Sequence, residues 1–282
     1  MNSSTKIIFL ALAALIAATP AFSQSRDSTA FTPSGNRPYR LNLKADIPIL
    51  AGSAAIDLYN FAEISKKSNS SVAEVESLST AKVDWFDRWA VHPYNKSADK
   101  LSYMPFYVAI PLPLIFEAID GRMRRQFGTL TTLYAESMFL TGVLYTSAVH
   151  YVNRHRPLVY ESGSPLGERT SSASRNSFFA GHVALVGTSV FFIANTWIAT
   201  HPDASGRGFW WGGAEAVTAL TAYLRNRAGE HFFSDVLLGN LVGVASGTLT
   251  PLLHRVRIKG KPVTISPWMG RGAGLTAFYR FN

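Results

Sequence analysis

None of the 282 residues is a cysteine. This absence excludes a disulfide framework and any metal site built from thiolates, so the stability of the chain must come from packing. The sequence also contains no internal repeat, and none of its apolar segments alternates strictly with polar residues. A repeat solenoid and a large amphipathic β-sheet are therefore disfavoured, and the apolar segments are better explained as buried helices.

Acidic residues are few relative to basic ones. The chain has 27 Lys and Arg against 18 Asp and Glu, which gives a formal net charge of +9. A basic surface favours anionic partners such as phosphate groups or acidic lipid headgroups. We expect no nucleic-acid partner, because the basic residues form no compact run and the N-terminus predicts export.

The N-terminus has the three parts of a secretory signal peptide. Lys6 supplies a short basic region, residues 7–18 are apolar, and Ala21-Phe22-Ser23 is a small-x-small cleavage site. The apolar run is short for a membrane span of about 20 residues, which is the alternative interpretation. Residues 1–23 are therefore predicted to be removed, and the mature protein is expected in the bacterial cell envelope, outside the cytoplasm.

The rest of the chain divides into three parts. Residues 24–40 are polar and predict a disordered lead-in. Residues 41–256 show no composition shift and predict one helical domain. Residues 257–282 contain "KPVTISPW" and "GLTAFYRF", whose β-branched and aromatic residues predict a small β-hairpin. Because an isolated hairpin is marginally stable, we expect this tail to pack on the helices or to bind an envelope protein partner.

The domain is predicted to be all-α, with six main helices. The six apolar segments are residues 45–62, 103–119, 130–152, 182–200, 210–224 and 235–254. Gly239, Gly243 and Gly247 lie four residues apart on one face of the last segment, where small residues allow close contact between helices.

Two stretches bear on membrane association. Residues 182–200 and 236–254 contain no Asp, Glu, Lys or Arg and are long enough to span a bilayer. These stretches favour a membrane-associated protein with some spanning helices, and a soluble periplasmic helical domain is the alternative.

Three polar clusters lie at the ends of the predicted helices. "NRHRP" (153–157) ends the third apolar segment, "SFFAGH" (177–182) begins the fourth, and "LRNRAGEHFFSD" (224–235) joins the fifth to the sixth. If the helices are antiparallel, all three clusters converge at one end of the bundle.

The residue types in these clusters suit phosphoryl transfer. Arg156 and Arg225 carry guanidinium forks that match phosphate oxygens. His182 follows a glycine at a helix start, where free backbone N–H groups favour an anion. His231 and Asp235 are four residues apart and share a face if the turn is helical, so the carboxylate could orient the imidazole. Each residue alone is more often structural, and it is their combination that indicates a site.

The three clusters resemble the signature of the type 2 phosphatidic acid phosphatase superfamily, which also includes vanadium haloperoxidases. That signature is K-x-x-x-x-x-x-R-P, then P-S-G-H, then S-R-x-x-x-x-x-H-x-x-x-D. The matching positions are Arg156, Pro157, Gly181, His182, Arg225, His231 and Asp235. The resemblance extends over residues 130–254 in its motifs and implies a six-helix bundle of this kind.

The resemblance implies a role for each matched residue. His231 would be the nucleophile that forms a phosphohistidine, Asp235 would orient it, and His182 would protonate the leaving oxygen. Arg156 and Arg225, with the backbone of Gly181, would bind the phosphate. It implies no metal and no cofactor, and its exported members act on membrane lipid phosphates and pyrophosphates, here with the site facing the periplasm.

The chain departs from the signature at several phosphate-contacting positions. The family's lysine, the Pro and Ser of the second motif and the Ser of the third are replaced by Val149, Phe179, Ala180 and Leu224. His150 and Arg154 are candidate substitutes for the lost contacts. Two functions stay open: a lipid phosphate phosphatase, or an inactive member that is a binding or structural component of an envelope complex. Haloperoxidase activity ranks third, because vanadate needs the same missing contacts.

Overall fold

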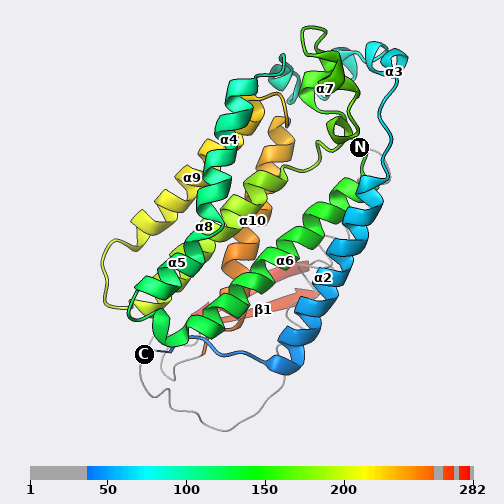
Figure 1. Cartoon of the computed structure of the whole chain (residues 1–282). Coiled ribbons are helices and arrows are strands. Elements are labelled where there is room, and N and C mark those ends of the chain that lie inside the picture. Colours follow the sequence, from blue (N-terminus) through cyan, green and yellow to red (C-terminus); the bar gives the residue numbers. More distant parts are fainter. Residues whose placement is uncertain (1–36, 257–262, 270–272, 280–282) are drawn as a thin grey trace.

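The computed structural model describes residues 37–256, 263–269 and 273–279. The expected signal peptide, residues 1–23, and most of the expected lead-in, residues 24–40, lie outside the described part of the chain. The described residues from 37 to 256 form an all-helical bundle (Figure 1).

The expected apolar segments all lie in helices. The long helices are α2 (Leu43–Ser65), α4 (Lys96–Ala109), α5 (Leu112–Ile119), α6 (Phe127–Tyr151), α8 (Gly181–Thr200), α9 (Arg207–Arg227) and α10 (Phe233–Leu253). The second expected segment is divided between α4 and α5. The division falls before Pro111, which has no backbone N–H to continue the hydrogen bonding of α4.

Helix α8 runs through the middle of the bundle and is the most buried of the long helices. Its closest neighbour is α10, as the spacing of the three glycines predicts. A Cβ atom on Gly239, Gly243 or Gly247 would lie 2.5–2.7 Å from a backbone oxygen of α8. Two helix backbones can approach this closely only where one side carries no Cβ.

Short helices and loops cover one end of the bundle. They include α3 (Val72–Glu76) and α7 (Leu166–Thr170), which lie above the N-terminal ends of α8 and α10 in Figure 1. The buried side chain of Arg169 holds this cover together. Its guanidinium donates to the backbone oxygens of Val159 (3.0 Å) and Val75 (3.2 Å).

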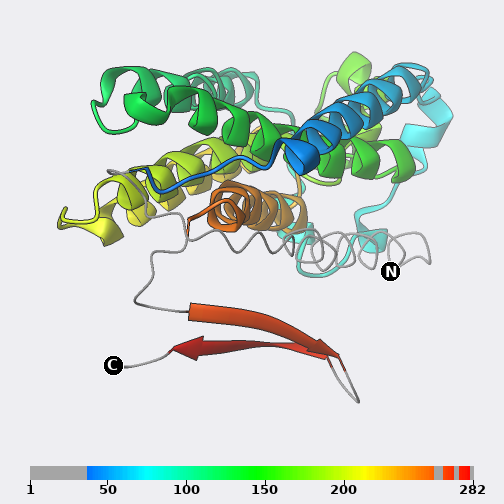
Figure 2. The ribbon, with the colours of Figure 1, turned by 90° about the horizontal axis from the view of Figure 1, so that it is seen from below.

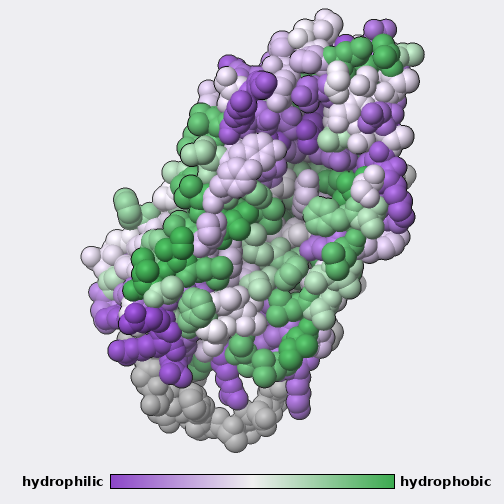
Figure 3. Space-filling view, in the orientation of Figure 1, coloured by the Kyte–Doolittle hydropathy of each residue, from purple (hydrophilic) through white to green (hydrophobic). Residues whose placement is uncertain are grey.

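The outer surface of the bundle is apolar along its middle. Figure 3 shows hydrophobic side chains over the central part and hydrophilic ones gathered at both ends. Large apolar side chains that face outward include Leu58 and Phe61 of α2 and Leu237 and Leu241 of α10. Three helical segments in the described residues are long and apolar enough to span a membrane: Lys96–Ile119, Gly181–Thr200 and Phe233–Leu253. These features indicate membrane association.

Two strands follow the bundle. β1 (Val263–Met269) and β2 (Ala273–Tyr279) are antiparallel, with Val263 opposite Tyr279 (Figure 2). The connection between them and the segment that leads from α10 lie outside the described residues. The predicted hairpin, and its packing or binding to a partner, therefore stay predictions.

Candidate active site

The structure brings the three polar clusters together at the covered end of the bundle. Backbone hydrogen bonds connect the three clusters. With the donor named first, they are Ser177 to Arg154 (3.1 Å), Ala180 to Asp235 (3.1 Å) and, from the residue that follows the first cluster, Leu158 to Gly229 (3.0 Å). The clusters form one unit because main-chain groups, which are satisfied in almost every folded protein, pair between them.

A glycine turn places His231 in this unit. Helix α9 ends at Arg227, and Gly229 follows with a φ of +77°, a conformation that favours glycine. A Cβ on Gly229 would lie 3.1 Å from the Cβ of Leu158, so the position is also crowded. The turn reverses the chain and directs Glu230 and His231 into the protein, where both are buried.

One hydrogen bond fixes the imidazole of His231. Its Nδ1 atom lies 2.7 Å from the backbone oxygen of Ser177. Because a carbonyl oxygen only accepts, Nδ1 carries the proton and the neutral ring has its lone pair on Nε2. Burial lowers the pKa of His231 well below its ordinary value, and the positive charges of Arg225 and Arg156 lower it further. The site therefore holds a neutral imidazole.

Asp235 supports His231 indirectly. Its carboxylate accepts hydrogen bonds from the hydroxyl of Ser177 (2.6 Å) and the backbone N–H of Phe232 (3.0 Å), and it forms an ion pair with Arg154. No hydrogen bond in the described residues joins Asp235 to His231. The expected direct contact is replaced by a path through Ser177, because the carbonyl of that residue already occupies Nδ1.

Arg154 is held by two buried carboxylates. Besides Asp235 it binds Asp87, with 2.6 Å between Nη2 and Oδ2, and its guanidinium lies 4.4 Å from the ring centre of Phe232. Burial alone would lower the pKa of Arg154, but the charges of Asp235 and Asp87 raise it. Because both carboxylates bind the guanidinium of Arg154, this group stabilises the fold and does not replace the lost lysine.

His150 does not replace that lysine either. Its Nδ1 lies 2.9 Å from the side-chain oxygen of Asn60 on α2, and its ring stacks on Tyr151. These contacts direct it to the interface between α2 and α6. The expectation that His150 or Arg154 compensates for Val149 is therefore wrong on geometry, because both side chains have other partners.

Arg156 and Arg225 converge on one carboxylate oxygen. Both guanidinium groups pair with Oε2 of Glu230, and the distance from Nη2 of Arg225 is 2.7 Å. The Nε atoms of both arginines are buried and have no hydrogen-bond partner in the described structure. Two forks that meet at one anionic oxygen, each with an unused donor, form a site suited to an anion with several oxygens.

Helix α4 supports this arginine pair from the other side. Nη1 of Arg225 donates to Asp99 (2.8 Å) and to the hydroxyl of Ser102 (3.2 Å). The Asn95 side chain caps the helix by accepting from the backbone of Ala98 (3.0 Å). Asp99 lies in the first turn of this helix, so the cap fixes the carboxylate that orients Arg225.

His182 begins α8 among aromatic rings. The ring centres of Tyr103 and Phe106 lie 4.9 and 4.8 Å from that of His182. Gly181 is required before it, since a Cβ there would lie 2.5 Å from the ring of Tyr145. The imidazole and the first N–H groups of the helix thus share a narrow site.

The altered signature positions are apolar core. Val149, Phe179 and Ala180 are almost fully buried, and Leu224 on α9 is buried as well. The backbone oxygen of Val149 accepts from Lys67 (2.6 Å), which also binds Asn176 (3.0 Å). The ammonium group of Lys67 is thus bound to a main-chain and an amide oxygen at this position.

Sequence reasoning missed four residues that shape the site: Ser177, Glu230, Asp87 and Asp99. Ser177 and Glu230 lie inside the quoted clusters, so their polar side chains were a visible signal. Asp87 and Asp99 precede Asp235 and Arg225 by more than a hundred residues, and no local pattern points to them.

Two pockets of the described structure lie next to the site. A polar one of about 390 Å³ is lined by residues such as Lys96 and Arg227. An apolar one of about 270 Å³ is lined by Trp89, Tyr223 and Phe233 and reaches Asn226. The amide of Asn226 donates to the backbone oxygen of His231 (3.1 Å), so the apolar pocket is one side chain away from the backbone of His231.

The comparison with protein families agrees with this geometry. Residues 130–259 match the sequence model of the PAP2 superfamily, which covers all three clusters and α6 to α10. The match is consistent with a member of the type 2 phosphatidic acid phosphatase superfamily, as the three clusters predict. This similarity suggests a phosphatase-type activity on phosphoric esters. No curated protein and no solved structure matches the chain.

Proposed function

We propose that the protein is a phosphatase that hydrolyses a phosphomonoester or pyrophosphate of a membrane lipid through a phosphohistidine on His231. The observation that carries the proposal is the meeting of Arg156 and Arg225 beside a neutral, buried His231. The carboxylate of Glu230 occupies part of the space that a phosphoryl group would take. Phosphate oxygens would satisfy the two Nε donors that the protein leaves unpartnered.

The mechanism follows from the tautomer of His231. Nε2 attacks phosphorus while Nδ1–H donates to Ser177, so the positive charge that develops on the ring is stabilised by a carbonyl dipole. The bond from phosphorus to the leaving oxygen breaks, and His182 donates a proton to that oxygen. Water then attacks the phosphohistidine while the now neutral His182 takes a proton from it, which releases phosphate, frees Nε2 of His231 and returns His182 to its protonated form. Arg156 and Arg225 hold the equatorial oxygens throughout.

The surroundings favour a lipid substrate. The apolar pocket lined by Trp89, Tyr223 and Phe233 opens on the bundle surface close to His231, where an acyl or prenyl chain could lie. The middle of the bundle is apolar on its outside, and three segments are long enough to span a bilayer. A lipid could then reach the site from the membrane, with its headgroup at the polar end, which we place on the periplasmic side.

The second candidate is an inactive member that binds a phosphorylated ligand. Two observations favour it: Glu230 already pairs with both arginines, and the lysine and serine positions of the signature are apolar. Lost donors to a transferring phosphoryl group each reduce the rate by roughly a hundredfold or more. This candidate would serve as a binding or structural component of an envelope complex, with the C-terminal tail as its contact.

The experiment is phosphate release by the purified full chain in detergent. Phosphatidate, a polyprenyl diphosphate and the soluble ester p-nitrophenyl phosphate are compared as substrates. We expect turnover that His231→Gln abolishes, together with an acid-labile phosphoenzyme in the wild type alone. His150→Gln is the matched control, because that imidazole faces Asn60, and it should retain activity. Phosphate binding without turnover of any substrate would support the second candidate.

A further inference from the structure

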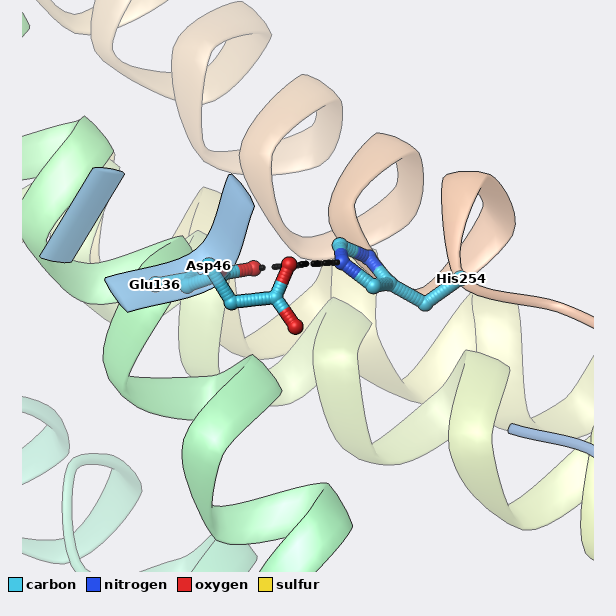
Figure 4. A group of neighbouring side chains, drawn as sticks. All are labelled: Asp46, Glu136 and His254. Carbon is cyan, nitrogen blue, oxygen red and sulfur yellow. Dashed lines mark hydrogen bonds and ion pairs between the residues drawn. The ribbon is translucent and has the colours of Figure 1, made fainter. Parts of the chain in front are cut away.

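A second group of buried polar side chains lies at the opposite end of the bundle. Asp46 in the first turn of α2, Glu136 of α6 and His254 after the end of α10 lie together (Figure 4). One atom of each lies within 4.8 Å of the others. Helix α10 separates this group from His231 by about 30 Å, at 1.5 Å per residue. It takes no part in the proposed phosphatase site.

A backbone carbonyl fixes the tautomer of His254, as one does for His231. Its Nδ1 lies 2.8 Å from the backbone oxygen of Thr250, an acceptor, so Nδ1 carries the proton. The Nε2 atom of the neutral ring then has a lone pair. It points at Oδ1 of Asp46 (3.2 Å) and Oε2 of Glu136 (3.6 Å). Three electron-rich atoms within 4.8 Å of one another repel unless a cation lies between them.

The two carboxylates have little else to balance them. Asp46 and Glu136 are each 1% exposed. The other oxygen of Asp46 accepts from the backbone N–H of Asn42 (2.7 Å). Glu136 makes no hydrogen bond within the described residues, and its Oε1 is buried without a partner there. A fully buried carboxylate without a donor is rare, and a bound ion is one of its ordinary causes.

The spacing fits a metal ion. Ligand atoms 2.0–2.1 Å from a tetrahedral zinc ion lie about 3.4 Å apart, close to the two observed separations. The hydrogen bonds around the three side chains fit as well. A metal-binding histidine usually donates its other ring N–H to a carbonyl, as His254 does. A metal-binding carboxylate usually accepts a further hydrogen bond, as Asp46 does.

We propose that Asp46, Glu136 and His254 bind a divalent transition-metal ion, with Zn²⁺ as the best fit and Mn²⁺ as the alternative. One nitrogen and two carboxylate oxygens are the donor set, and the free oxygen of Glu136 or a water completes the coordination. The ion fastens the start of α2 to α6 and to the end of α10. Its role is structural, because no substrate-binding residue of the phosphatase site lies near it.

The test uses the purified full chain in detergent. After exposure to Zn²⁺ or Mn²⁺ and removal of free metal, elemental analysis should find about one ion per chain. The melting temperature should rise with added metal and fall with a chelator, as binding to the native state alone requires. Phosphatase activity is measured in parallel and should change little with the chelator below the melting temperature.

Two variants keep the size of the ligands. Glu136→Gln and Asp46→Asn should fold, since each removes a buried charge and keeps an oxygen acceptor. Both should lose bound metal and the metal-dependent rise in melting temperature, while the metal-free melting temperature stays equal or increases. Glu117→Gln is the matched control, a buried carboxylate that accepts from Thr131 (2.8 Å) and has no histidine beside it. It should keep the metal response.

Three results would overturn the proposal. The first is a wild-type protein that binds neither ion and whose melting temperature does not change with metal or chelator. In that case a proton on Nε2 of His254 would be the cation between the two carboxylates. The second is a metal response that survives in both ligand variants. The third is a Glu117→Gln protein that loses the response as fully as Glu136→Gln.

Discussion

The Nδ1 atom of His231 lies 2.7 Å from the backbone oxygen of Ser177, and the hydroxyl of the same serine lies 2.6 Å from Asp235. Ser177 therefore connects the proposed nucleophile to a buried carboxylate by its two polar groups. This arrangement fixes the tautomer of His231 through the main chain, which no side-chain substitution can remove. Asp235 acts on His231 only by holding Ser177 and the start of α10.

This relay predicts an unequal effect of two substitutions. Ser177→Ala keeps the carbonyl oxygen, so kcat should fall less than about tenfold. Asp235→Asn weakens the pairing with Arg154 and disturbs the loop, and kcat should fall roughly a hundredfold with little change in KM. Steady-state kinetics on one soluble ester would measure both. Equal losses in the two variants would mean that Asp235 acts through the Ser177 hydroxyl alone, and would contradict a role for its pairing with Arg154.

The lowered pKa of His231 predicts how stability depends on pH. The native imidazole stays neutral below pH 6.5, where the unfolded chain takes up a proton. Stability should therefore be full above about pH 6.5 and decline as the pH falls below it, by up to about 1.4 kcal/mol per pH unit. His231→Gln removes the titrating group, so its melting temperature should decrease less between pH 7.5 and pH 5.5. An identical decrease in both proteins would show that His231 is not the group responsible.

The shared carboxylate of Glu230 predicts competition with phosphate. Glu230→Gln leaves Arg156 and Arg225 with a neutral acceptor, so inorganic phosphate should bind roughly tenfold more tightly, about 1.4 kcal/mol. Without phosphate the variant should be less stable, because Arg156 loses its ion-pair partner and Arg225 keeps only Asp99. Binding is measured by calorimetry and stability by thermal unfolding. Asp99→Asn, which removes a carboxylate from the other side of Arg225, is the control and should not tighten phosphate binding as much.

The contact between α8 and α10 predicts which glycines are required. A Cβ on Gly243 would lie 2.7 Å from the backbone oxygen of Ala184, so Gly243→Ala should destabilise the protein by about 1–3 kcal/mol. Gly212 on α9 has nothing within 4 Å of the same position, and Gly212→Ala should be neutral or slightly stabilising. Thermal unfolding in one detergent compares the two. Similar stability of both variants would argue against this helix packing.

The apolar pocket predicts a residue that distinguishes lipid from soluble substrates. Trp89 lines the pocket, is 62% exposed and lies 5.8 Å from Phe233, ring centre to ring centre. Trp89→Ala should raise KM for a lipid phosphate roughly tenfold, while kcat/KM for p-nitrophenyl phosphate should change less than about twofold. Equal effects on both substrates would mean that the lipid chain lies elsewhere.

Local patterns in the sequence determined the helices and the places where polar residues gather at their ends. Apolar segments of helical length, the glycine spacing on α10 and the three polar clusters are all short-range features, and each is found in the structure where the sequence puts it. These features follow from burial and from helical periodicity, which depend on neighbours within a few residues.

Only the tertiary structure decided the pairing of charges. In the sequence, Arg154 is a candidate to bind phosphate, whereas in the structure it pairs with Asp87 and Asp235. Glu230 pairs with both arginines of the site. Asp46 and His254 meet across more than two hundred residues. A charge buried by folding takes whichever partner the packing of the helices brings within reach, and that partner leaves no local pattern in the chain.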